Sequence, residues 1–96
     1  MLTLEVGIRI YNRGDMANPD HYGTVVAVVT DKWGTRYQIR PDADSCERDA
    51  YWINKELVSE TDTGNGLSRI VTEKEHERFR QERIAAMADR MKAGAR

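Results

Sequence analysis

The chain has 96 residues, of which 15 are Lys or Arg and 16 are Asp or Glu, so its net charge is -1. This length suits one small domain with an appendage and excludes two independently stable cores. The near balance of charge argues against a whole-chain affinity for nucleic acid or an anionic membrane. No stretch approaches the roughly 20 apolar residues of a membrane span.

The charge is unevenly distributed along the chain. Residues 1–68 carry a net charge of -4 and residues 69–96 a net charge of +3, so an acidic body precedes a basic tail. The single cysteine, Cys46, cannot form an internal disulfide. The N-terminus lacks the pattern of a secretory signal, and we therefore expect a cytoplasmic protein.

Five short strands are expected within the first sixty residues. Alternating aliphatic residues, β-branched runs and turn-forming Gly, Pro, Asn and Asp set their limits. The expected strands are residues 6–11, 24–30, 35–40, 51–53 and 58–60, with a long loop over 12–23 and a single helical or 3₁₀ turn at "NKEL". This pattern predicts a mainly β domain over residues 1–60.

The turn between the second and third strands carries a tryptophan. Asp31 and Gly34 suit the first and last positions of a turn, which places Trp33 at its tip. Trp33 is either a contact for a partner or a lid that folds over the rim or under the C-terminal helix. Tyr37 is expected in the core, and Trp52 is expected on the surface.

A flexible linker over residues 61–71 and a helix over residues 72–96 complete the expected organisation. Thr72 and Glu75 form a capping box, and strong helix formers follow. Such a helix is about 30 Å long, so only part of it can pack on its own domain. Ile84, Met87 and Met91 form a narrow apolar stripe on this amphipathic helix.

The segments "VGIRI", "GTVVAVV", "TRYQIR" and "YWINKELV" resemble the successive strands of the SH3-like small barrel, in its Tudor or KOW-like form, over residues 4–60. The resemblance implies a five-stranded SH3-like barrel followed by one long C-terminal α-helix. Members of the family bind peptides, nucleic acid, ribosomes or polymerase and rarely catalyse. Their ligand surface is often aromatic, and the matching positions here are Tyr11, Tyr22, Trp33 and Trp52.

Metal and catalytic motifs fail at necessary positions. Asp42 and Asp44 have calcium-loop spacing, but Glu47 stands where that loop needs Gly and Ile53 where it needs Glu. Cys46 has no spacing to His21 or His76 that indicates a nucleophile and its base. We therefore expect no metal, no cofactor, no small-molecule substrate and no enzymatic activity.

Two functions remain as hypotheses. The first is a protein-binding adaptor that contacts another protein or a second copy through Tyr11, Tyr22, Trp33, Trp52, Met87 and Met91. Family analogy also suggests a small accessory or inhibitory protein of a phage or plasmid. The alternative is nucleic-acid binding, in which barrel aromatics stack on bases and the tail contacts phosphates through Arg83, Arg90, Lys92 and Arg96.

Overall fold

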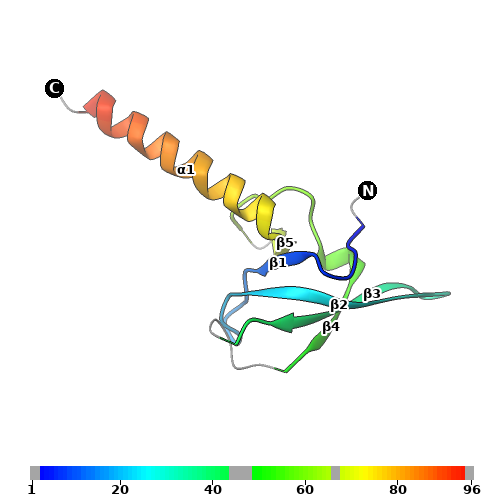
Figure 1. Cartoon of the computed structure of the whole chain (residues 1–96). Helices are drawn as coiled ribbons and strands as arrows, with labels where there is room; N and C mark the ends of the chain where they lie inside the picture. The colour runs from blue at the N-terminus through cyan, green and yellow to red at the C-terminus, as the bar shows by residue number, and fades with distance from the viewer. Residues whose placement is uncertain (1–2, 44–48, 66–67, 95–96) are drawn as a thin grey trace.

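Five antiparallel strands form one sheet, and a single long helix leaves its edge (Figure 1). The computed structural model describes residues 3–43, 49–65 and 68–94. The strand order is β4-β3-β2-β1-β5. The elements are β1 (Arg9–Asn12), β2 (His21–Asp31), β3 (Gly34–Pro41), β4 (Tyr51–Asn54), η1 (Lys55–Leu57, a 3₁₀ turn), β5 (Ile70–Thr72) and α1 (Glu73–Gly94). The predicted class, mainly β with one C-terminal helix, is confirmed.

The sheet curls into a half-barrel. The register of β2 against β3 shifts between Val25 and Ala27, and such a bulge bends the strand and increases its twist. Beyond η1, Val58 forms a parallel bridge with Ile70. The backbone N–H of Ser59 also donates to the Ile70 carbonyl at 2.8 Å. The chain after β4 therefore joins β5 over a short stretch, which partly closes the barrel.

The core lies on one face of this sheet. Its buried members come from the N-terminal segment and from every strand: Leu4, Ile10, Val25, Tyr37, Ile39, Ile53 and Ile70. Tyr37 is fully buried, as its alternation with Ile39 predicts, and its hydroxyl accepts a hydrogen bond from the Leu4 backbone N–H at 3.3 Å. Tyr51 is half-buried against the same cluster.

The first strand begins later than the sequence pattern predicts. Gly7 has a φ of +96°, a left-handed conformation that interrupts an extended strand. Val6 is consequently 64% exposed instead of facing the core, and β1 begins only at Arg9. The second strand begins earlier than predicted, at His21, so the loop between the two strands is shorter than expected.

The β2–β3 hairpin turns at the predicted residues. Asp31 pairs with Gly34, and the Asp31 carboxylate accepts a hydrogen bond from the Trp33 N–H at 2.9 Å. Gly34 has a φ of +124°, which glycine adopts without a Cβ clash. The end of the hairpin extends beyond its neighbouring strands (Figure 1). Trp33 is 82% exposed there, so the lid, one of its two alternative roles, is wrong, and the partner contact stays a prediction.

The fifth strand lies in the segment predicted to be a linker. Ile70 and Val71 are buried in β5, which pairs with β1. The strand predicted at residues 58–60 is wrong, because Val58 forms only an isolated bridge. The two apolar residues of β5, Ile70 and Val71, are too few to produce an alternating sequence pattern that would predict a strand. Their burial depends on pairing with a strand far away in the sequence.

The helix begins at its predicted cap and then leaves the domain. The Glu75 N–H donates to the Thr72 hydroxyl at 3.1 Å, which is one half of the predicted capping box. The Glu75 carboxylate accepts hydrogen bonds from the Asp62 N–H and from Arg78. Near its start α1 lies against β1 and β5, and its remaining length projects away from the sheet (Figure 1). The radius of gyration is 15.7 Å, against about 12.5 Å for a compact chain of this length. The molecule is therefore elongated by its helix and its hairpin.

Candidate functional site

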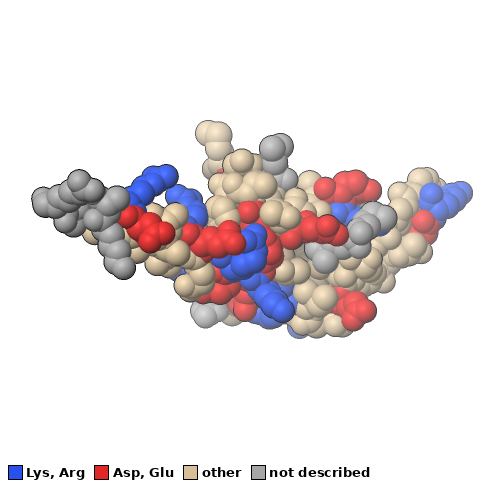
Figure 2. All heavy atoms as spheres, turned by 90° about the horizontal axis from the view of Figure 1, so that it is seen from above, with Lys and Arg blue, Asp and Glu red and all other residues tan. Residues whose placement is uncertain are grey.

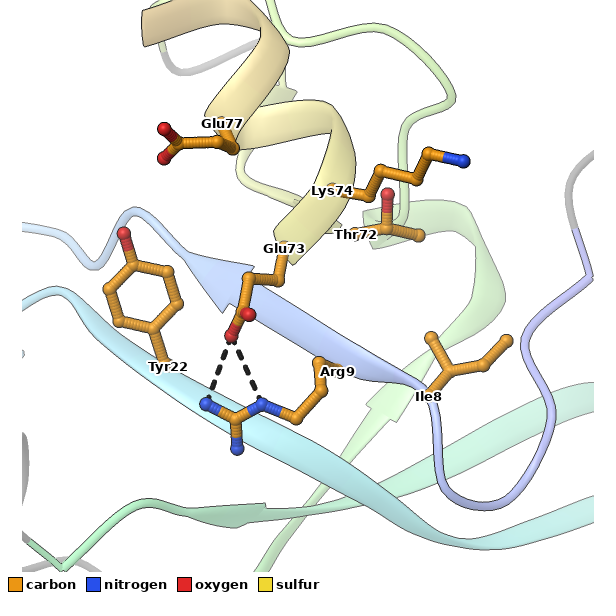
Figure 3. A pocket seen from close by; sticks show the side chains of 7 residues that line it. All are labelled: Ile8, Arg9, Tyr22, Thr72, Glu73, Lys74 and Glu77. Carbon is orange, nitrogen blue, oxygen red and sulfur yellow. Dashed lines mark hydrogen bonds and ion pairs between the residues drawn. The ribbon is translucent and has the colours of Figure 1, made fainter.

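The first turn of α1 is fixed to the sheet by Arg9 of β1 (Figure 3). The Arg9 guanidinium donates to both carboxylate oxygens of Asp42, at 2.6 Å each, and to the Thr24 hydroxyl at 3.1 Å. Its Nε and Nη2 both lie 3.0 Å from the Glu73 carboxylate. Four of the five N–H donors of the guanidinium are therefore used in hydrogen bonds within the protein, and Nη2 also forms an ion pair with Glu73. Arg9 is therefore engaged within the protein and positions the helix.

Arg9 also forms part of the wall of an open pocket of about 870 Å³ (Figure 3). The charged side chains of this pocket have mixed signs, because Glu73 and Glu77 face it together with Lys74. Hydrogen bonds from Arg9 hold the pKa of Asp42 below its ordinary value, against the effect of desolvation. The charges around this pocket therefore compensate one another and give it no preference for an anion or a cation.

A buried carboxylate, Asp62, fixes the second turn of α1. Its side chain has no solvent exposure and accepts hydrogen bonds from Nδ1 of His76 and from the Gly64 N–H, at 2.8 Å each. The Arg13 guanidinium forms an ion pair with the same carboxylate. Burial acts to raise the pKa of Asp62, but these hydrogen bonds and the charge of Arg13 outweigh it, so the pKa lies below the ordinary value.

Two of the predicted aromatic residues, Tyr11 and Tyr22, lie beside His76 near the start of α1. The His76 ring stacks on Tyr11 with centroids 3.7 Å apart, and the Tyr22 ring lies 5.1 Å from Tyr11. Tyr11 is buried, and its hydroxyl donates to Asp20 at 2.8 Å. Burial and this bond raise the pKa of Tyr11 to about 12. One face of Tyr11 is thus occupied by the helix itself.

The two tryptophans lie in a different part of the molecule. Nine residues of β2 separate Tyr22 from the turn that carries Trp33, which corresponds to about 30 Å of extended strand. The structure therefore does not bring the four predicted aromatic residues to one point. Trp52 is 48% exposed, and the Arg36 guanidinium lies 5.9 Å from its ring centroid. Lys32 lies 4.5 Å from the Trp33 ring, so each indole already has a cation from this chain beside it.

The predicted apolar stripe lies on the outer half of α1, residues 81–94, and its side chains are exposed. Every side chain from Gln81 to Met91 is exposed. Ile84 is 54%, Met87 58% and Met91 72% exposed, and their spacing places them along one side of the helix. We call these three residues the outer stripe. Nothing in the described part of the chain covers it.

The outer stripe is flanked by basic residues. Among the described residues, neither Arg83 nor Arg90 has a carboxylate within ion-pair distance, whereas Arg78 pairs with both Glu75 and Glu82. The Lys92 side chain and Arg96, which were predicted to contact phosphates, lie outside the described residues. Figure 2 shows acidic and basic side chains intermingled over the middle of the upper face. Among the described side chains of the outer helix, Arg83 and Arg90 are therefore the basic residues without an ion-pair partner.

The residues that hold the helix were not predicted from the sequence; they are Arg9, Arg13, Asp62 and His76. The bond from the Gly64 N–H to the Asp62 carboxylate is a local turn motif that Asp-x-Gly could have indicated. The ion pair between Arg13 and Asp62 joins residues 49 apart in the sequence. No local pattern reports such a contact.

Neither a metal site nor a membrane-spanning helix is found in the described residues, and no known protein matches the chain. No group of three or more His, Cys, Asp or Glu in residues 3–43, 49–65 and 68–94 could hold a metal ion. Asp44 and Cys46 lie outside these ranges. Within the same ranges no helix is long and apolar enough to cross a membrane. No protein-family model, curated protein or solved structure significantly matches the chain.

Proposed function

We propose that this protein is a non-enzymatic adaptor that binds a partner protein through the outer half of α1. The observation that carries the proposal is the outer stripe, which is more than half exposed on a helix that leaves its own domain. Exposed apolar side chains in a row typically mark an interaction surface. The half-barrel then serves as the base that holds the helix, in keeping with its resemblance to SH3-like binding modules.

The chemistry of the outer helix suits a groove with an acidic rim. An amphipathic helix that lays its apolar side into a hydrophobic groove uses anchors at intervals of three, four and seven residues, as Ile84, Met87 and Met91 do. Methionine adapts its flexible side chain to irregular surfaces. Arg83 and Arg90, which lack acidic partners among the described residues, would pair with carboxylates at the rim.

The same charges favour a different protein over a second copy of this chain. Two outer helices paired through the stripe would bring their basic flanks together in either direction. Residues 83–96 contain four basic residues and only Asp89 as an acid. Like charges placed side by side disfavour such a pair. We therefore expect the full chain to be a monomer in solution, and a dimer in sedimentation equilibrium would contradict this choice of partner.

Nucleic-acid binding is the second candidate, because Arg83 and Arg90, which have no carboxylate partner in the part of the chain that the structure describes, could equally contact phosphates. A salt titration separates the two functions. Electrostatic binding to DNA or RNA is strongest at low salt, so a failure to bind at about 50 mM salt would exclude this candidate.

Photo-cross-linking in the native cells tests the proposed function. A benzophenone side chain is introduced at Met87, within the stripe, or at Ala86, which lies about 100° further round the helix. Both positions are exposed. The proposal predicts a protein adduct at Met87 that Ala86 does not form. Equal adducts at both positions, or a nucleic-acid adduct at Met87, would contradict it.

A further inference from the structure

A second pocket, of about 360 Å³, lies at the point where α1 leaves the sheet. Arg13 contributes to it from the loop after β1, and the other lining residues lie on α1: His76, Phe79, Arg80, Arg83 and Ile84. We call it the root pocket. It combines three guanidinium groups and an imidazole with two apolar side chains, and none of its lining residues is acidic.

The positive charge of the root pocket is incompletely neutralised. Arg83 has no carboxylate partner among the described residues, and its guanidinium lies 5.7 Å from the centroid of the Phe79 ring. Arg80 is 3.7 Å from the Glu77 carboxylate, which is longer than a hydrogen bond. Arg13 shares the buried Asp62 with His76. Within the described residues, these three guanidinium groups face two carboxylates, those of Asp62 and Glu77, which leaves an excess of one positive charge.

Two of the polar groups are already held in position. The Arg13 Nε donates to the Ser68 carbonyl at 3.3 Å, and its Nη2 pairs with Asp62. His76 is held by the same carboxylate and by its stack on Tyr11. Groups that are fixed before binding lose less conformational entropy when a ligand arrives. One side of the root pocket is therefore preorganised, and Arg80 and Arg83 supply the adaptable side.

We infer that the root pocket receives a glutamate or aspartate side chain of the partner protein. A guanidinium group binds a carboxylate through paired N–H donors. Phe79 and Ile84 offer apolar surface to the methylene groups of such a side chain, which a free inorganic anion would leave uncovered. Ile84 also belongs to the outer stripe, so one partner segment can contact both. The inference rests on the proposed function and specifies the partner's chemistry.

Nuclear magnetic resonance of the full chain tests this inference. The signals followed are the Nε–Hε groups of Arg80 and Arg83 and the methyl groups of the outer stripe. The probes are a blocked peptide of leucine and glutamate, the same peptide with glutamine in place of glutamate, and inorganic phosphate. The glutamate peptide is expected to shift both sets of signals, and the glutamine peptide is expected to leave the arginine signals unchanged.

Two variants with the same change of charge complete the test. Arg83→Gln removes a lining guanidinium and should weaken binding of the glutamate peptide about fivefold. Arg78→Gln removes a guanidinium that pairs with Glu75 and Glu82 and does not line the pocket, so binding should change less than about twofold. Equal weakening by the two variants would show a general charge effect and overturn the inference.

The remaining outcomes separate this inference from the proposed function. Methyl shifts in the outer stripe without arginine shifts would overturn the pocket assignment and leave the proposed function standing. Arginine shifts without methyl shifts would support the pocket and contradict binding along the stripe. Tighter binding of inorganic phosphate than of the glutamate peptide would identify a phosphate site and overturn the assignment to a carboxylate.

Discussion

The inner and outer halves of α1 have similar helix-forming compositions but different surroundings. In the inner half, residues 73–80, His76 is buried, Phe79 is half-buried and Glu73 is bound by Arg9. In the outer half, every described side chain is exposed. Both halves therefore form a helix, but only the inner half packs against the rest of the protein. The inner half contributes to stability, whereas the outer half is available to a partner.

The largest predicted effect on stability is expected from a change in the core of β5, the strand that precedes the helix. Ile70 is 1% exposed, and Ile70→Ala should lower the free energy of unfolding by about 2–5 kcal/mol in urea titrations. Val6→Ala is the matched control, because Val6 is exposed, and it should change stability by less than about 0.5 kcal/mol. Equal, small effects would show that β5 is not part of the core.

The next effect concerns the buried carboxylate of the inner half. Asp62→Asn leaves Arg13 without its ion-pair partner and should lower the free energy of unfolding by about 3 kcal/mol at pH 7. The pKa of Asp62 is lowered in the folded protein. Its stabilising contribution is therefore present above the ordinary Asp pKa of about 3.9 and is lost as the pH falls through the folded value.

Urea titrations of the wild type and Asp62→Asn at several pH values measure this contribution. The difference in stability should be full at pH 7 and should shrink at pH values below the ordinary pKa of the carboxyl group. Asp89→Asn, at an exposed site, is the control and should show little difference at any pH. A difference for Asp62→Asn that stays constant into acid would contradict the role assigned to its ionised form.

A smaller effect is expected where the chain meets the inner helix at Phe79. Gly64 has a φ of +75°, and a Cβ there would lie 2.5 Å from the Phe79 ring. Gly64→Ala should destabilise the protein by about 1–3 kcal/mol. Gly34→Ala is the control, because Gly34 also has a positive φ but a Cβ there would have no neighbour within 4 Å. A double-mutant cycle with Phe79→Ala should show coupling for Gly64 and none for Gly34.

The smallest stability effect is expected in the outer half. Met87→Gln and Ala86→Gln should each change the free energy of unfolding by less than about 0.5 kcal/mol, because both side chains are exposed. Thermal melts of the two variants provide this measurement. A clear loss of stability for Met87→Gln alone would show that the stripe is packed within the protein, which would remove the distinction between the two halves.

Local chemistry predicted the features that depend on near neighbours in the sequence. The turn from Asp31 to Gly34, the cap at Thr72 and the buried phase of Tyr37 each follow from residues within a few positions. The described part of α1, Glu73–Gly94, likewise lies within the helix predicted over residues 72–96. These contacts involve backbone geometry that short sequence motifs encode.

Long-range contacts account for what the sequence could not predict. Ile70 and Val71 form a strand only because β1 pairs with them, and Arg13 meets Asp62 only after the barrel has curled. The exposure of Val6 follows from a positive φ at Gly7 that alternating hydrophobicity does not reveal. For the candidate site, the stripe on α1 was predicted, but the root pocket combines residues from two distant segments.

The affinity of the purified partner, once cross-linking has identified it, tests the central claim most directly. Isothermal titration calorimetry compares the wild type with Met87→Gln and Ala86→Gln. If the outer stripe is the binding surface, Met87→Gln should weaken the affinity by about tenfold or more, which corresponds to about 1.4 kcal/mol. Ala86→Gln should leave it nearly unchanged. Equal affinities for all three proteins would contradict the assignment of the outer helix as the interaction surface.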